Sequence, residues 1–122
     1  MASRAGSVVD GARALQTRNR LMPSSFFFAR LVPNRPDFPM SMTADEQATM
    51  RAHGEFLQGQ LAAGTLVAAG PVLDPKGVFG LAVFEAESMD AVHRLLERDP
   101  ARAIGRYEVL PMASAFVRPA SK

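Results

Sequence analysis

His53 has the clearest capacity for chemistry among the side chains of this 122-residue sequence. It lies three residues after Met50 and four residues before Leu57, so a helix would place the three side chains on one apolar face. Histidine exchanges protons near neutral pH, which suits it to act as a general acid or base. The simpler alternative is a histidine packed in the core with no catalytic role. The neighbouring Gly54 predicts a close approach of another backbone segment.

A general-base histidine works best when a second group fixes its other ring nitrogen, and a carboxylate is a common choice. Asp99 follows the second predicted helix, which lies beside the helix of His53 in the topology argued below. The Asp99 carboxylate could therefore approach the imidazole. An Asp-Pro pair is at least as typical of a turn or a capping residue, and the spacing alone leaves both roles open.

Three further residues are candidates for substrate binding. Arg30 lies in an otherwise apolar strand and could bind a substrate carboxylate, although a lone arginine on a strand is more often exposed or paired. Phe38 in a proline-rich loop and Met50 on the His53 face could line a pocket; simple packing on the core is the alternative. The other histidine, His93, falls on the predicted solvent side of its helix, and we expect no function for it.

Composition excludes several other kinds of site. The chain has no cysteine, which rules out disulfides, cysteine-based zinc sites and a thiol nucleophile. Two histidines leave little material for a histidine-rich metal site. The sequence contains no phosphate-binding glycine motif and no nucleophile elbow around a serine. We therefore predict neither a cofactor nor a metal.

The charge distribution restricts the possible partners. The net charge is +2, but residues 1–22 hold four arginines and one acid, and the remainder holds ten basic and eleven acidic residues. The main part of the chain thus lacks the clustered basic surface that nucleic acids require, and an RNA-recognition role for its strands is disfavoured. No apolar run is long enough to span a membrane. We expect a cytoplasmic protein that binds a small molecule, with no nucleic-acid or membrane partner.

The chain is predicted to contain one domain. Residues 1–25 form a disordered or extraneous tail, with a transit peptide as the alternative; residues 26–118 form the domain, and residues 119–122 form a C-terminal tail. Apolar residues make up 48% of the chain, which is ordinary for a globular protein and excludes disorder of the whole chain.

Six elements are predicted, in the order strand, helix, strand, strand, helix, strand. Thr43 and Glu46 form a capping box at the start of the first helix, and Gly64 ends it. Three prolines predict that the loop of residues 33–42 has no regular structure. The elements span residues 26–32, 43–63, 65–73, 78–85, 88–98 and 106–117.

This order is that of a ferredoxin-like α+β fold, in which both helices cover one face of a four-stranded antiparallel sheet. The strands 26–32 and 78–85 carry apolar side chains on both faces, so the face without helices is apolar too. A monomer rarely leaves so large an apolar patch in water. We therefore predict a homodimer in which two sheets pack face to face to form an α+β barrel.

The sequence resembles the YCII-related (YciI-like) domain family over residues 26–118. The segments that carry the resemblance are TADE, MRAHGEFLQGQLAAG, VAAGPVLDPKGVFGLAVFEAES and the Asp99-Pro100 pair, in that order. The resemblance implies a ferredoxin-like fold, dimeric α+β barrels, and an active site built on His53 and Asp99. Many members have a phenylalanine where this chain has Ala101, so the pocket wall is expected to differ. Most members have no established reaction.

We predict that His53 abstracts a proton from a small aromatic or enol-type substrate while Asp99 holds the imidazole. Elimination or isomerisation would fit, since neither reaction needs a cofactor. The alternative is a non-catalytic dimer that binds a small metabolite or serves as a structural module. A dimeric monooxygenase of the same architecture is less favoured, because the chain has no tryptophan and a single tyrosine. The distinguishing observation is whether His53 opens onto a pocket or lies sealed in the core.

Overall fold

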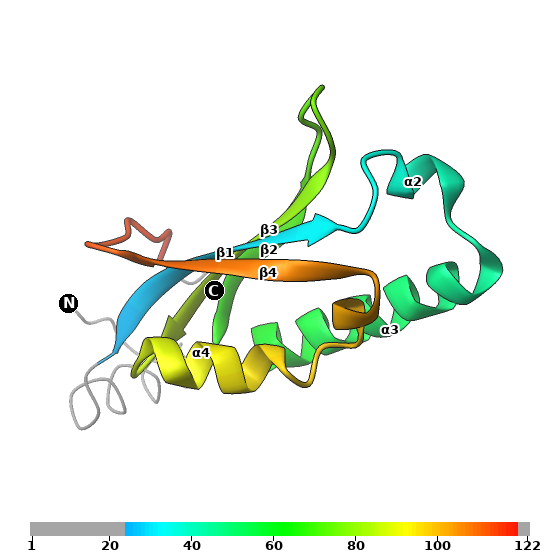
Figure 1. Cartoon of the computed structure of the whole chain (residues 1–122). Helices are drawn as coiled ribbons and strands as arrows, with labels where there is room; N and C mark the ends of the chain where they lie inside the picture. The colour runs from blue at the N-terminus through cyan, green and yellow to red at the C-terminus, as the bar shows by residue number, and fades with distance from the viewer. Residues whose placement is uncertain (1–23, 120–122) are drawn as a thin grey trace.

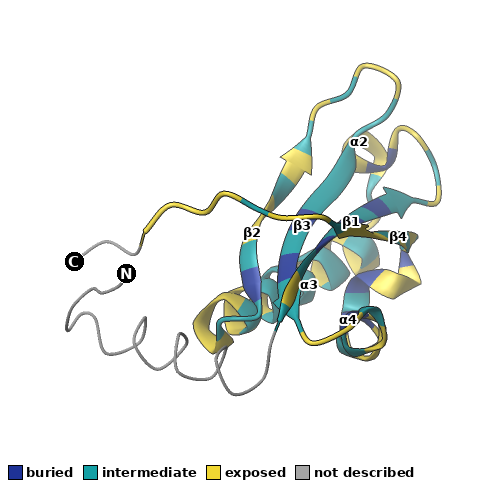
Figure 2. Ribbon diagram, turned by 90° about the vertical axis from the view of Figure 1, so that its left-hand side faces the viewer, coloured by how far each residue is buried: buried dark blue, intermediate teal, exposed yellow. Residues whose placement is uncertain are grey.

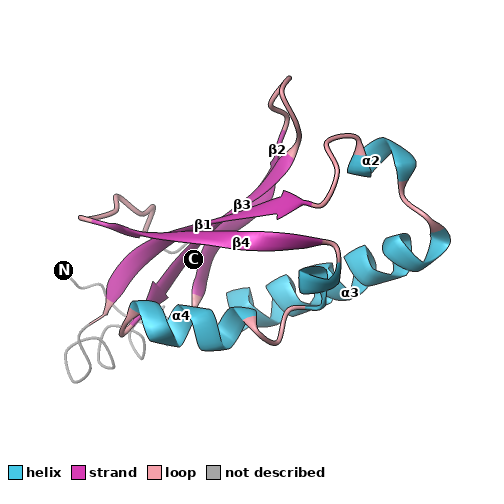
Figure 3. Cartoon of the chain, in the orientation of Figure 1, coloured by secondary structure: helices cyan, strands magenta, loops and turns pink. Residues whose placement is uncertain are grey.

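The structure, a computed structural model, describes residues 24–119. Figures 1 and 3 show a twisted sheet with the two longer helices packed against one face. This arrangement confirms the predicted α+β architecture with a four-stranded antiparallel sheet. The predicted N-terminal tail lies almost wholly outside the described residues, as does most of the C-terminal one. In the part of the chain that the structure describes, no helix is long and apolar enough to cross a membrane.

The sheet has the order β2-β3-β1-β4, with every neighbouring pair antiparallel. The two central strands come from opposite halves of the chain, which is the connectivity expected of a split βαβ fold. β2 and β4 are the edges, and each carries one proline, as edge strands tolerate. The strands are β1 (Ser25–Pro33), β2 (Leu66–Val72), β3 (Phe79–Ala86) and β4 (Gly105–Met112).

The helix that carries the candidate histidine is α3 (Ala44–Ala63). The predicted capping box is present, because the Thr43 side chain accepts from the Glu46 N–H and the Glu46 side chain accepts from the Thr43 N–H. Gly64 ends the helix with φ +83°, a left-handed conformation that glycine adopts without strain. The second long helix, α4 (Met89–Leu96), is capped by Ser88 and is followed by a short 3-10 helix, η1 (Pro100–Ala103).

The expectation of an irregular loop over residues 33–42 is wrong, since this segment contains a short helix, α2 (Phe38–Ser41). Pro39 stands in its first turn, where a missing N–H removes no helical hydrogen bond. The helix buries Phe38, which is 3% exposed, and turns Met40 outward at 90% exposed. α2 therefore contributes one apolar anchor to the core.

The last strand also ends earlier than predicted, at Met112 rather than at residue 117. Its register with β1 extends only as far as the pair of Phe26 with Met112, one residue from the start of β1 at Ser25. Without a partner strand to bond to, the chain leaves the sheet. Figure 2 shows this last described segment as largely exposed, and the Phe116 side chain in it is wholly accessible to solvent.

The core consists of two adjoining apolar clusters between the sheet and the helices. One lies beneath the middle of the sheet, where Phe84 and Val92 are completely buried. The other lies at the α2 end and is built on Leu31, Phe38 and Ile104. Tyr107 packs against both clusters. The α2-end cluster surrounds the candidate site.

Candidate active site

His53 projects from α3 toward the sheet, and its imidazole meets the buried carboxylate of Asp99. The Nδ1 atom of His53 lies 2.9 Å from both oxygens of that carboxylate. The His53 side chain is 13% exposed, whereas the Asp99 side chain has no exposed surface. The structure thus brings together the two residues that the sequence singled out, with the histidine on the accessible side.

Asp99 is held by its own backbone as well as by the histidine. It is the N-cap of η1, and its Oδ1 accepts a hydrogen bond of 2.9 Å from the Ala101 N–H. The capping role and the contact with His53, which the sequence left as alternatives, are therefore both present in one side chain. Since the cap fixes the carboxylate against the backbone, it also fixes the direction from which the imidazole is held.

A third donor, Tyr107, completes the set around this carboxylate. Its hydroxyl donates to Asp99 Oδ2 over 2.5 Å. The sequence alone does not identify Tyr107 as part of the site. The alternation of β4 could have predicted that Tyr107 and Val109 face the helices, but the contact depends on the register that sets Tyr107 opposite Leu31.

The three hydrogen bonds decide the ionisation of Asp99. Burial raises the pKa of its carboxyl. The hydrogen bonds from His53, Tyr107 and the Ala101 N–H together lower the pKa by a larger amount, so the pKa lies below its ordinary value. Burial and the bond to Asp99 raise the pKa of the Tyr107 phenol well above its usual range. At neutral pH, Asp99 is therefore ionised and Tyr107 remains a protonated donor.

An ionised carboxylate can only accept hydrogen bonds, so the nitrogen of His53 that contacts it must carry the hydrogen. In the neutral imidazole, this assigns the proton to Nδ1 and leaves the lone pair on Nε2. No hydrogen bond joins Nε2 to any residue in the described range 24–119. The geometry thus prepares His53 to accept a proton at Nε2.

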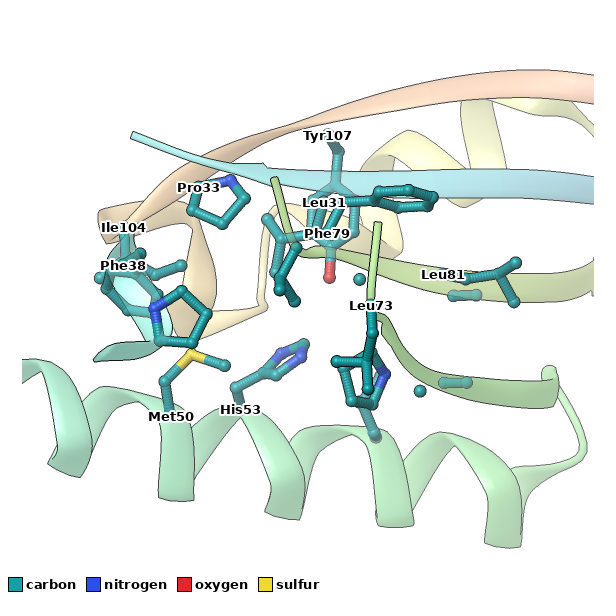
Figure 4. A pocket seen from close by; sticks show the side chains of 18 of the residues that line it. Leu31, Pro33, Phe38, Met50, His53, Leu73, Phe79, Leu81, Ile104 and Tyr107 are labelled. Carbon is teal, nitrogen blue, oxygen red and sulfur yellow. The ribbon is translucent and has the colours of Figure 1, made fainter. Parts of the chain in front are cut away.

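His53 lines a cavity of about 410 Å³ between α3, α2 and the β2–β3 side of the sheet. Figure 4 shows its ring projecting from α3, with the Tyr107 hydroxyl pointing toward the same space from the sheet. The histidine therefore opens onto a pocket and is not sealed in the core. The other lining side chains are almost all apolar and include Phe38, Met42, Met50, Leu57, Leu73, Phe79 and Ile104.

The remaining predicted binding residues divide into two groups. Phe38 and Met50 both line the cavity. Arg30 does not line it; its guanidinium carbon lies 4.0 Å from the centre of the Phe79 ring, and its side chain belongs to the sheet face remote from the helices. Gly54 also differs from expectation, since an added Cβ there would meet no atom within 4 Å.

The wall that α2 contributes to the cavity is fixed by Arg35. Its guanidinium donates to both carboxylate oxygens of Glu46, at 2.8 and 3.0 Å, and to the side chain and carbonyl of Ser41. The bond from Arg35 is the main cause that lowers the pKa of Glu46 to about 2. This network ties the end of α2 to the first turn of α3.

Across residues 24–119, no group of three His, Cys, Asp or Glu side chains is placed to hold a metal ion. The polar side chains described at the site are His53, Asp99 and Tyr107.

Comparison with known proteins supplies the context for this geometry. Residues 26–114 match the family model of the YCII-related domain. A 5-chloro-2-hydroxyhydroquinone dehydrochlorinase from Burkholderia phenoliruptrix, solved with 2,5-dihydroxybenzoquinone, shares the fold with a TM-score of 0.52 and 22% identity, over 69% of this chain and 90% of that one. A variant of a cofactor-independent oxygenase from Streptomyces nogalater aligns with a TM-score of 0.43 and 16% identity, over 80% and 98% of the two chains. No curated protein matches the sequence.

Proposed function

Because the chain belongs to the YCII-related domain family, we propose that it is a small enzyme that transfers protons without a cofactor, with His53 as the base. The observation that carries this proposal is the pairing of His53 Nδ1 with a buried, ionised Asp99, while Nε2 is left to a cavity of substrate size. A carboxylate behind the imidazole stabilises the imidazolium that forms when Nε2 accepts a proton.

The reaction is an elimination or an isomerisation. Nε2 of His53 takes the proton from an acidic C–H or O–H bond, and the electron pair of that bond stays on the substrate. In an elimination, that pair forms a new double bond as a leaving group departs with its own bonding electrons. In an isomerisation, the imidazolium returns the proton to a different atom. Asp99 stays ionised throughout and holds the ring in place.

Solvent deuterium exchange tests proton abstraction directly. Candidate compounds are incubated with the protein in D₂O, and NMR follows the replacement of hydrogen by deuterium at carbon. The dehydrochlorinase that shares this fold acts on a hydroxyhydroquinone, so hydroxylated benzenes head the panel, followed by cyclic ketones and enol lactones.

We expect wild-type protein and His93→Gln to accelerate exchange, and His53→Gln to lose about 10²–10⁴-fold of that acceleration. His93 is the matched control because it is the other histidine and lies exposed on α4. Equal exchange in wild type and His53→Gln would refute the proposal. Binding of the compound without exchange would favour the alternative, a non-catalytic metabolite-binding module.

We also propose that the protein is a homodimer formed through the sheet face that carries no helix. The side chains of β1 and β3 that point away from the helices include Phe28, Leu81 and Val83, which stay partly accessible, and Leu110 on β4 is 60% exposed. An apolar surface of this kind is stabilised when a second copy covers it. A cytoplasmic location remains a prediction.

A further inference from the structure

We infer that the cavity beside His53 selects molecules that enter uncharged, with an apolar body and one acidic hydrogen, and that it rejects carboxylates and phosphates. This inference deepens the proposed function and rests on it for the role of His53. The property in question is the charge of the ligand that this cavity binds.

The lining offers a ligand one polar side-chain atom that makes no hydrogen bond to another described residue. Of the residues that line the cavity, only His53 and Tyr107 carry polar side chains. The Tyr107 hydroxyl is engaged with Asp99, and so is Nδ1 of His53. Nε2 of His53 remains, and the Tyr107 oxygen can still accept a hydrogen bond through its lone pairs. Apolar pockets with few convergent polar groups bind ligands by their apolar surface and orient them by those groups.

No lysine or arginine is among the residues that line the cavity. Arg30 stacks on the Phe79 ring and does not line the cavity, and Arg35 is bound to Glu46 and Ser41. Beside a neutral His53, a carboxylate or phosphate that entered would lose its hydration without gaining an ionic partner, which is costly in an apolar site. The ionised Asp99 behind the histidine would repel it further.

An uncharged acid meets neither obstacle. When its proton moves to Nε2, the ligand becomes an anion and His53 becomes an imidazolium, so the net charge of the site does not change. The new anion lies next to the new cation, and that cation is paired with Asp99 on its other side. Within the cavity, charge therefore arises only as a matched pair.

The size of the cavity agrees with a compact ligand. Its volume of about 410 Å³ lies toward the lower end of small-molecule sites. Phe38, which is buried at the α2 end, provides aromatic surface on one side. A substituted single ring is therefore a suitable probe.

Three nitrobenzenes of similar size separate charge from acidity. 4-Nitroanisole is uncharged and has no acidic hydrogen, 4-nitrophenol is an acid whose phenolate is yellow, and 4-nitrobenzoate is an anion. Binding is measured by ligand-observed NMR titration at a pH where free 4-nitrophenol is mostly protonated. Absorbance of the same samples reports how much bound 4-nitrophenol has lost its proton.

We expect 4-nitroanisole and 4-nitrophenol to bind with similar affinity, and 4-nitrobenzoate to bind at least about a hundredfold more weakly. Bound 4-nitrophenol should turn yellow with wild type and with His93→Gln, but not with His53→Gln. In His53→Gln, the affinity for 4-nitroanisole should persist, which shows that the variant retains its cavity.

Binding of 4-nitrobenzoate as tightly as the uncharged probes would overturn the inference, and so would failure of both uncharged probes to bind. Selective binding of the two uncharged probes without a yellow phenolate would have a different meaning. The charge selectivity would stand, and the role of His53 as a base would fail.

Discussion

Tyr107 and His53 donate hydrogen bonds to the same carboxylate from two different layers of the fold. Tyr107 reaches Asp99 from β4 of the sheet, and His53 reaches it from α3. Among the residues that the structure describes, Asp99 is the one buried charged side chain. The carboxylate is therefore both the orienting group of the proposed base and a polar link between sheet and helix.

Removal of the Tyr107 hydroxyl should destabilise the protein but leave His53 and Asp99 in place. We expect Tyr107→Phe to lower the free energy of unfolding by about 1–3 kcal/mol at neutral pH, because a buried carboxylate loses one donor. The folded pKa of Asp99 is depressed, so its stabilisation is present above the unfolded pKa and is lost as pH falls through the folded one. Urea unfolding should therefore show a difference from wild type that shrinks below about pH 4. A difference that does not change with pH would contradict this account.

Asp99→Asn should separate orientation from capping. Asparagine caps helices as well as aspartate does, so the start of η1 should persist. The uncharged amide cannot stabilise an imidazolium as a carboxylate does, and we expect deuterium exchange to fall by about 10²–10⁴-fold. Asp99→Ala should lose both functions, with a further loss of about 1 kcal/mol of stability from the missing cap. Full exchange activity in Asp99→Asn would show that the charge is dispensable.

The bond between Arg35 and Glu46 should give the protein an acid-sensitive element. The pKa of Glu46 is about 2 in the folded protein, below its ordinary value of 4.5. Its stabilisation is therefore complete above the unfolded pKa and is lost as pH falls toward 2. We expect Glu46→Gln to lower the melting temperature at neutral pH and to approach wild type in acid. Glu108→Gln, which breaks the exposed pair with Arg106, is the control and should change little. Equal effects of the two variants would contradict the prediction.

Two glycines should respond to alanine in opposite directions. Gly59 lies within α3, and a Cβ there would meet no atom within 4 Å. We expect Gly59→Ala to stabilise the protein by roughly 0.5–1 kcal/mol, because alanine loses less backbone freedom on forming a helix. At Gly105 a Cβ would lie 2.4 Å from the carbonyl oxygen of Val32, so Gly105→Ala should destabilise. Chemical denaturation of both variants provides the comparison, and a shift of the same sign in both would refute it.

The proposed dimer should dissociate when a charge is placed on the open sheet face. Leu110 is 60% exposed on β4, and Met40 is 90% exposed on α2, away from the sheet. Sedimentation should find wild type and Met40→Glu as dimers and Leu110→Glu as a monomer, because the glutamate would be buried unpaired between the sheets. A monomeric wild type at micromolar concentration would refute the proposal.

Local signals in the sequence were sufficient for most of the fold. The capping box at Thr43, the stop at Gly64 and the Ser88 cap each act within one turn, so the sequence could predict them. The short helix α2 is not evident from the sequence, because three prolines indicate an irregular loop, whereas one proline is compatible with a first helical turn. The end of β4 depends on where its partner strand begins, which no local pattern encodes.

The candidate site shows the same difference between what the sequence can predict and what depends on the pairing of strands. The contact of His53 with Asp99 could be predicted because the topology sets the loop after α4 beside α3. Tyr107 required the register between two strands, which a single sequence does not determine. The side of the sheet that Arg30 occupies depends on which alternate positions of β1 are buried, and both sets of positions are largely apolar.

The cap on η1 also makes one backbone amide a reporter of the site. The N–H of Ala101, a residue with no exposed surface, donates to the carboxylate that orients His53. Its nitrogen and proton chemical shifts should therefore respond when Asp99 gains or loses a proton. Its rate of exchange with solvent should report how often that corner of the chain opens. The state of the Asp99 carboxylate can thus be followed in the unaltered protein, from a resonance that belongs to neither member of the His53–Asp99 pair.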